Sequence, residues 1–187
     1  MGNWWEFEGT VTLYHGTNED KSQSILKEGF KPVDVDEAID SALRRLNLSR
    51  AMVPEWIWKY ELSYRKDKPD THFSTQKAQA EAYAKGALWG GEIETCVFEA
   101  MRRWMKELTG KDLNFPAPKP VVITVDVPWE VVKTHLSDEE LREVKVRVTE
   151  LAQRRGQDPA EIFRDVGYQF TASGPIPASY ITKWEFV

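Results

Sequence analysis

A chain of 187 residues that is 41% hydrophobic and 29% charged has the length and composition of one globular domain with a full core. Its net charge of −5 argues against a broad nucleic-acid-binding surface, which needs clustered Lys and Arg. The single cysteine, Cys96, excludes an internal disulfide and favours a cytoplasmic setting, and three scattered histidines do not predict a metal site. No apolar stretch reaches the roughly 20 residues of a membrane helix, so no membrane partner is expected.

The chain begins with the pattern of a strand followed by a short helix. Residues 7–14 alternate between apolar and polar side chains, which predicts a strand that ends at His15. Asn18 or Asp20 would cap the helix at its beginning, because a short polar side chain accepts a hydrogen bond from the first free backbone N–H groups. Gly29 is well placed to end that helix.

Residues 34–70 are predicted to form a helical insertion. A first helix would begin at Asp34 or Asp36, because the apolar residues that follow recur three and four positions apart and so share one helix face. Pro54 predicts the beginning of a second helix. The rest of the insertion is charged and indicates a solvated loop.

The middle of the chain predicts a short strand at residues 71–74 and an alanine-rich helix at residues 76–87 that is capped by Ser74 or Thr75. A glycine pair breaks the chain before a longer helix. That helix covers residues 92–108, and the residues predicted on its buried side are Val97, Ala100, Met101, Trp104 and Leu108.

The last part of the chain alternates between strands and helices. The predicted elements are a central strand at 121–127, a helix at 137–154 opened by a capping box, a shorter helix from 158, and strands at 166–172 and 181–187. The whole pattern, without internal repeats or domain linkers, predicts a single α+β domain over residues 1–187.

Three places combine a strand end with polar side chains suited to chemistry. They are residues 14–17 (Tyr-His-Gly-Thr), residues 71–75 (Thr-His-Phe-Ser-Thr), and residues 168–170 ahead of the turn at 174–177 (Gly-Pro-Ile-Pro). A sheet can bring such segments together from the start, middle and end of a chain. Because rigid strand ends present side chains and backbone N–H groups to a ligand, a single cleft is predicted there.

The order of these motifs resembles the ADP-ribosyltransferase fold, the NAD-binding split β-sandwich of poly(ADP-ribose) polymerases, diphtheria-type toxins and RNA 2′-phosphotransferases. The family's aromatic-His-Gly-Ser/Thr motif is similar to residues 14–17. Its second motif is similar to residues 72–74, with Tyr83 ten residues past the phenylalanine. Its third places a catalytic Glu eight residues before the last proline of the turn, which is Gln169 ahead of Pro177 here.

The resemblance implies an α+β, ADP-ribosyltransferase-like split β-sandwich with helical insertions, of which residues 34–70 are one. It implies an enzyme that transfers ADP-ribose from NAD to a protein, nucleic-acid or nucleotide acceptor and releases nicotinamide, in a toxin, phage or defence setting. NAD is then a substrate, and no metal is needed. The implied NAD-binding residues are Tyr14, His15, Gly16, Thr17, Ser74 and Tyr83, and the implied catalytic residues are His15, His72 and Gln169.

The side chains in these motifs suit that chemistry. Nicotinamide is a flat cation whose carboxamide needs a donor and an acceptor, which the backbone of Gly16 would supply because glycine permits close approach. Tyr83 would stack on the ring. His15 would hydrogen-bond the adenosine-side ribose, assisted by Thr17. Breaking the glycosidic bond creates an oxocarbenium-like species, so a polar group such as Gln169 is wanted beside the nicotinamide ribose.

The chain departs from the family pattern in the catalytic half of the site. Gln169 can hold a ribose hydroxyl but cannot take its proton. Ala80 stands where the polymerases have a Ser that bonds the carboxamide. Glu161, Asp165 and Glu185 are nearby in sequence and are alternative sources of a carboxylate, although none has the spacing of the motif.

Two other functions stay open. The first is an RNA 2′-phosphotransferase-like activity, because that family also has a second histidine where His72 stands, with Arg65 as a candidate phosphate ligand. The second is a catalytically silent module that binds NAD or ADP-ribose, which the missing Glu favours. The oligomeric state is open, and for any histidine at a strand end a purely structural role competes with a functional one.

Overall fold

The computed structural model describes residues 9–32, 34–56, 71–87, 89–112, 116–132, 136–172 and 175–187. Within them the chain is an α+β fold built on one open, five-stranded antiparallel sheet. The strands are β1 (Thr10–Asn18), β2 (Thr71–Ser74), β3 (Pro120–Pro128), β4 (Gln169–Ala172) and β5 (Ile181–Phe186). Their order across the sheet is β4-β2-β1-β3-β5, so the strand that carries His15 lies in the middle.

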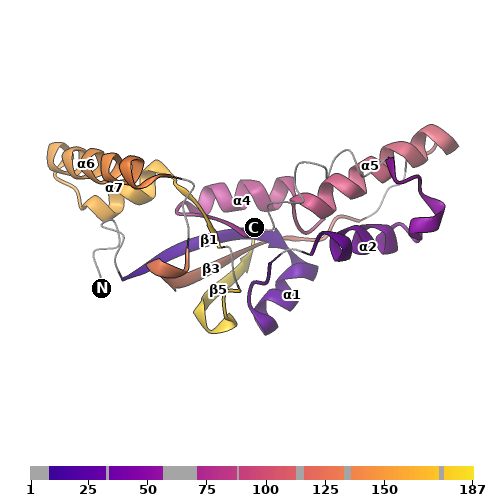
Figure 1. The fold of residues 1–187 in the computed structure, drawn as a ribbon, viewed down its shortest axis with the longest axis horizontal. Helices are drawn as coiled ribbons and strands as arrows, with labels where there is room; N and C mark the ends of the chain where they lie inside the picture. Colours follow the sequence, from indigo (N-terminus) through magenta and orange to yellow (C-terminus); the bar gives the residue numbers. More distant parts are fainter. Residues whose placement is uncertain are drawn as a thin grey trace.

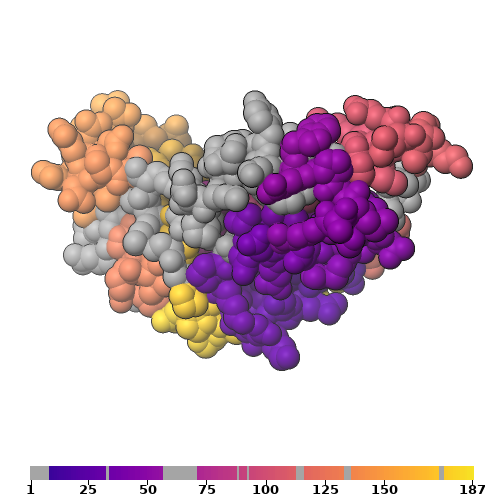
Figure 2. Space-filling view, turned by 45° about the vertical axis from the view of Figure 1, so that its right-hand side comes forward, coloured from indigo at the N-terminus to yellow at the C-terminus, as the bar shows by residue number. Residues whose placement is uncertain are grey.

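Six α-helices surround this sheet in the part of the chain that is described. They are α1 (Glu19–Glu28), α2 (Val35–Arg45), α4 (Lys77–Gly86), α5 (Glu92–Thr109), α6 (Asp138–Arg155) and α7 (Pro159–Val166). Helices α6 and α7 lie at one end of the molecule, and α2 and α5 lie at the other (Figure 1). In the space-filling view the surface of α2 adjoins that of α1, while α5 and α6 form opposite edges (Figure 2).

The main hydrophobic core lies on one face of the sheet. Alternate residues of β1, Val11 and Leu13, are buried there together with Phe73 of β2 and Phe170 of β4. Helices α6 and α7 complete this cluster, with Phe163 of α7 packed against Phe170. Each such side chain contributes roughly 1.5–3 kcal/mol when it is removed from water, so this cluster holds the sheet and both helices together.

Helix α4 covers the other face of the sheet, where Gly16 allows close approach. Residues of opposite parity along a strand point to opposite faces, so Gly16 faces away from the core of Leu13. A Cβ atom on Gly16 would lie 2.1 Å from the carbonyl oxygen of Ala80 and 2.8 Å from the backbone nitrogen of Ala84. Only glycine therefore fits between β1 and the backbone of α4.

A second hydrophobic cluster joins α2 to α5, which lie side by side (Figure 1). Ile39 and Leu43 of α2 are buried with Val97 and Met101 of α5. Trp89, just before α5, stacks on Phe98 with 3.7 Å between the ring centroids. The α2–α5 pair therefore has a core of its own beside the sheet.

The predicted helix caps of α1 and α6 are confirmed. The side chain of Asn18 accepts a hydrogen bond from the Lys21 backbone N–H, and Gly29 ends the helix with φ of 80°. At α6, Ser137 and Glu140 form the reciprocal capping box. These short-range patterns define both helices because all the partners lie within one turn.

Two strand boundaries differ from the predictions. β1 does not end at His15 but continues to Asn18, because residues 15–18 remain paired with β3. β4 begins at Gln169 rather than at Val166, which is the last residue of α7. Gly167 follows with φ of 76°, a left-handed conformation that ends the helix. The predicted strand had combined the last residue of α7, the turn at Gly167 and β4 in one segment.

Two details of the helices were also predicted wrongly. The cap residue of α4 is Gln76, not Ser74 or Thr75, although the Ser74 hydroxyl does accept a hydrogen bond from the Gln76 backbone N–H. On α5, Leu108 is 64% exposed instead of buried, because the α2 cluster reaches only the first part of the helix.

The strand predicted at 121–127 is interior, as expected, but β1 rather than β3 is the middle strand.

The insertion predicted over residues 34–70 is described only in its first part. Helix α2 begins after its cap residue Asp34, as predicted. The helix expected after Pro54 extends into residues 57–70, which lie outside the described residues. A split β-sandwich needs two sheets, and the described residues form a single open sheet, so the sandwich stays a prediction. None of the described helices is both long and apolar enough to cross a membrane.

Candidate functional site

The three predicted motif segments meet at one cleft. Its volume is about 670 Å³, within the range of roughly 300–1,000 Å³ typical of small-molecule sites. The walls come from β1, β2 and β4 together with α1, the segment that leads into α2, the beginning of α2, α4 and the beginning of α5. Of the residues predicted to form the site, those that line it are Tyr14, His15, Gly16, His72, Ser74, Tyr83 and Gln169.

His15 lies where β1 and β2 separate. The two strands share one register pair, Tyr14 opposite Ser74, after which β1 continues along β3 and β2 along β4. At this point the His15 ring bridges the strands, with its Nδ1 atom 2.9 Å from the backbone oxygen of His72. The ring packs edge-on against Phe30, with 5.0 Å between centroids. The His15 side chain therefore replaces a backbone hydrogen bond between β1 and β2.

The hydrogen bond to His72 defines the protonation of His15. A carbonyl oxygen can only accept, so Nδ1 carries the hydrogen and Nε2 is the unprotonated acceptor of a neutral ring. Burial lowers the pKa of His15 to about 4, and the bond to the His72 carbonyl opposes that shift only in part. At neutral pH the cleft thus contains a neutral imidazole whose Nε2 can accept a hydrogen bond from a ligand hydroxyl.

A row of polar residues crosses three strands at the position before His15, and because Tyr14 and His15 are consecutive on β1, this row and the His15 ring point to opposite faces of the sheet. Tyr14 of β1 is opposite Ser74 of β2, which is opposite Gln169 of β4. Directly paired residues share one face of a sheet, here the face that α4 covers. The Ser74 hydroxyl donates to Gln79 of α4 over 2.6 Å, so it anchors that helix. Gln169 is exposed in the cleft and is the member of the row best placed to meet a ligand.

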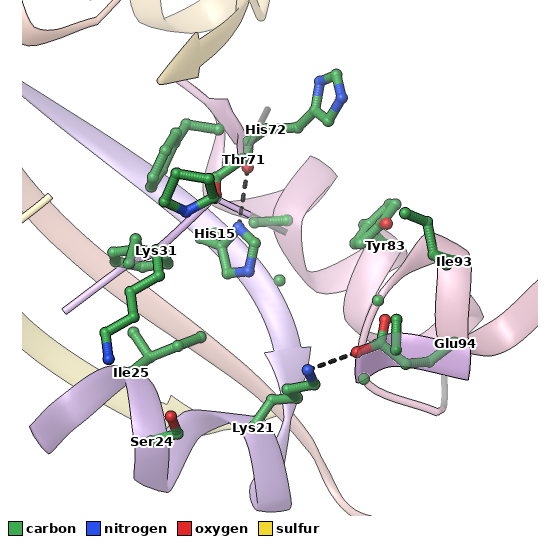
Figure 3. A pocket seen from close by; sticks show the side chains of 18 of the residues that line it. His15, Lys21, Ser24, Ile25, Lys31, Thr71, His72, Tyr83, Ile93 and Glu94 are labelled. Carbon is green, nitrogen blue, oxygen red and sulfur yellow. Dashed lines mark hydrogen bonds and ion pairs between the residues drawn. The ribbon is translucent and has the colours of Figure 1, made fainter. Parts of the chain in front are cut away.

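Tyr83 of α4 forms the wall of the cleft across from His15. Its side chain is 41% exposed, and it lies with Ile93 and Glu94 on one side while His15 lies on the other (Figure 3). Both rings line the same cleft. Gly16 lines the cleft as well, although its lack of a side chain is explained by the approach of Ala80 rather than by a ligand.

Two predicted residues are placed differently from the expectation. Thr17 is buried and does not line the cleft; its hydroxyl donates to the backbone oxygen of Gly90 over 3.3 Å. The ring of His72 is exposed and points away from His15 (Figure 3), so the residue meets His15 through its backbone.

The alternative carboxylates Glu161, Asp165 and Glu185 do not line the cleft. Arg65 and Gly174 lie outside the described residues.

The sequence interpretation missed an ion pair in the cleft wall. Lys21 of α1 contacts Glu94 of α5 with 2.5 Å between Nζ and Oε1 (Figure 3). A signal for this pair was present, because Glu94 lies on the same helix face as Ile93 and Val97. A carboxylate inside an apolar stripe needs a charged or hydrogen-bonding partner. The partner itself could not be identified from a pattern along the chain.

The site offers hydrogen bonding, aromatic contact and a lysine, with glutamine as the polar side chain at the β4 edge. This set of groups suits a ligand that has hydroxyls and a planar ring. No family model matches the chain, and neither a curated protein nor a solved structure matches it.

Proposed function

We propose that the chain is an NAD-dependent ADP-ribosyltransferase of the split β-sandwich type. It would bind NAD in the cleft, transfer ADP-ribose to a protein or nucleic-acid acceptor, and release nicotinamide. The observation that supports this most is the convergence of the three motifs. Tyr14, Ser74 and Gln169 form one row across neighbouring strands, and His15 bridges the place where two of them separate.

The two halves of NAD find suitable partners along this cleft. The exposed ring of Tyr83 can stack on the nicotinamide cation, an arrangement that a cation–π contact stabilises. Nε2 of His15 can accept a hydrogen bond from a ribose hydroxyl, because the neutral ring presents an acceptor there. Both contacts use groups that the fold already orients, so little ordering is needed on binding.

In the proposed reaction the bond between the ribose C1′ and the nicotinamide nitrogen breaks, and nicotinamide leaves with the bonding electrons. A nucleophile of the acceptor then forms the new bond to C1′ and gives up its proton to solvent water. Gln169 would hold a hydroxyl of the nicotinamide ribose and so orient the sugar. An amide cannot accept the proton of the acceptor, so the proposal predicts slow turnover unless the acceptor ionises readily.

A second function is favoured by one specific observation. Gln169 replaces the family Glu, and the carboxylates Glu161, Asp165 and Glu185 lie outside the cleft lining. A site of this kind can bind NAD or ADP-ribose without turnover and act through a partner protein. We therefore propose the silent binding module as the alternative to the transferase.

Labelled NAD distinguishes the two proposals. The transferase predicts nicotinamide release that His15→Ala abolishes and that the exposed-ring variant His72→Ala leaves largely intact. NAD binding without release, in the presence of cell extract as a source of acceptors, favours the silent module. Release only with 2′-phosphorylated RNA would favour a phosphotransferase-like activity. Absence of both binding and release would contradict all three.

A further inference from the structure

The ion pair of Lys21 and Glu94 packs against the glycine pair, Gly90 and Gly91, in the turn between α4 and α5. Gly90 has φ of 115°, and a Cβ atom there would lie 2.9 Å from Cγ of Lys21. A Cβ atom on Gly91 would lie 2.6 Å from the carboxylate of Glu94. The glycine pair therefore does more than separate two helices, because its missing side chains leave space for the aliphatic chain of Lys21 and for the carboxylate of Glu94.

The burial of this pair argues for a role beyond stability. Glu94 has a side chain only 5% exposed, whereas that of Lys21 is 37% exposed. Removing a carboxylate from water carries a large desolvation cost, and an ion pair seldom recovers much more than that cost. Its position in the wall of the cleft that contains His15 indicates instead that Glu94 holds the lysine for a ligand.

We propose that Lys21 binds a phosphate group of a nucleotide ligand and that Glu94 is its positioning residue. An ammonium group has three donors. Among the described residues Lys21 forms an ion pair with Glu94 alone. The N–H donors of its ammonium group that do not contact Glu94 can therefore face the cleft. Ser24 lies one helical turn further along α1, lines the cleft and adds a hydroxyl donor (Figure 3). The inference rests on the proposed function, since it places the diphosphate of NAD beside α1.

The other charged residues of the cleft do not create a positive field, so the proposed phosphate contact depends on Lys21 itself. The remaining charged residues in its described lining are Glu28, Lys31, Asp34 and Glu37. Glu28 is ion-paired with Lys31, and the Asp34 side chain accepts hydrogen bonds from two backbone N–H groups of α2. Carboxylates outnumber cations, so an anion is held by contact with Lys21 and not by a general positive field. A steep salt dependence of ligand affinity is therefore not expected.

Calorimetric titration with ADP-ribose and with adenosine tests the proposal. Lys21→Met should weaken ADP-ribose binding by about tenfold or more, the usual effect of losing a charge-assisted hydrogen bond, and should leave adenosine binding unchanged. Lys27→Met is the matched control, because Lys27 is on the same helix but is exposed and outside the cleft. Equal losses for both ligands, or no loss for ADP-ribose, would overturn the proposal.

An exchange of the two charges separates ligand binding from structure. The double variant Lys21→Glu with Glu94→Lys restores an ion pair, so thermal unfolding should return toward that of the wild type. ADP-ribose affinity should stay low, because the ammonium group then lies on the buried side. Recovery of both properties would show that the pair is only structural. Lys21→Met alone leaves the buried carboxylate of Glu94 without its partner and can unfold the protein. In that case the double variant Lys21→Met with Glu94→Met, which removes both charges, is used for the ligand titrations.

The outcome also separates this inference from the transferase proposal. If Lys21→Met removes the preference for ADP-ribose over adenosine while the wild type releases no nicotinamide, the phosphate site stands and the transferase fails. If the wild type releases nicotinamide and Lys21→Met leaves KM for NAD unchanged, the transferase stands and the phosphate site fails. A wild type that binds neither ADP-ribose nor adenosine contradicts both.

Discussion

The imidazole of His15 donates a hydrogen bond from Nδ1 to the main-chain oxygen of His72, 2.9 Å away, where β1 and β2 separate. One side chain thereby does two things. It closes the gap between two strands that no longer pair, and it directs its second nitrogen toward a cleft. A structural and a ligand-binding role for His15 are thus compatible, because the two nitrogens of a neutral imidazole differ in chemistry.

This geometry predicts a pH-dependent stability. The pKa of His15 is lowered from 6.5 to about 4 because burial disfavours the charged ring. Between these pH values the unfolded chain binds more protons, so the contribution of His15 is complete above about pH 6.5 and is lost as the pH falls toward 4. His15→Gln does not titrate there. We expect the difference in unfolding free energy between the two proteins to change by about 1–3 kcal/mol across this range.

Urea unfolding of both proteins at several pH values measures that difference. Above about pH 6.5 it should be constant, since the ring is neutral in both the folded and the unfolded chain. Parallel pH profiles of the wild type and His15→Gln would contradict the assigned protonation of His15.

A second prediction concerns the contact between β1 and α4. Gly16→Ala places a methyl group against the backbone oxygen of Ala80, which cannot rotate away, so we expect a loss of about 1–3 kcal/mol or more in unfolding free energy. Gly86→Ala is the matched control. A Cβ atom there meets nothing within 4 Å, and alanine favours a helix, so it should be neutral or stabilising by up to about 1 kcal/mol. Equal effects would mean that α4 does not pack as described.

A third prediction tests the separate core of α2 and α5. Met101 is completely buried in this cluster, so Met101→Ala should cost about 2–5 kcal/mol by leaving a cavity. Leu108 lies two turns further along the same helix and is exposed, so Leu108→Ala should change stability by less than about 0.5 kcal/mol. Thermal or urea unfolding compares them. A large effect at Leu108 would show that this position is covered by a partner in solution.

Much of the fold could be predicted from short-range patterns. Asn18 and Ser137 begin their helices, and Gly29 ends one, through contacts within a single turn. The boundary near Val166 could not be predicted in the same way, because the segment 166–172, which joins the end of α7 to β4, is too short to show a clear helical or strand period. The exposure of Leu108 depends on how far the cluster shared with α2 reaches along α5, which is a property of the tertiary structure.

The candidate site also has a part that the sequence predicts and a part that depends on tertiary packing. The motif residues Tyr14, Ser74 and Gln169 were identified from the sequence, and the register places them in one row across β1, β2 and β4. What Ser74 and Thr17 bond to was not predictable, because their partners Gln79 and Gly90 depend on how α4 and the following turn pack. The Lys21–Glu94 pair joins helices that are far apart in the chain. The pattern along α5 indicates that Glu94 needs a partner, but it does not identify Lys21 as that partner.

The last prediction asks whether the missing carboxylate limits activity. Gln169 is exposed and lies opposite Ser74 at the cleft, so Gln169→Glu should fold normally. If the site is that of a transferase, a carboxylate there stabilises positive charge at the ribose and accepts a proton, and nicotinamide release should rise by about tenfold or more. Gln79→Glu in the same cleft controls for added charge alone. Unchanged release in Gln169→Glu, with NAD still bound, would favour the silent module.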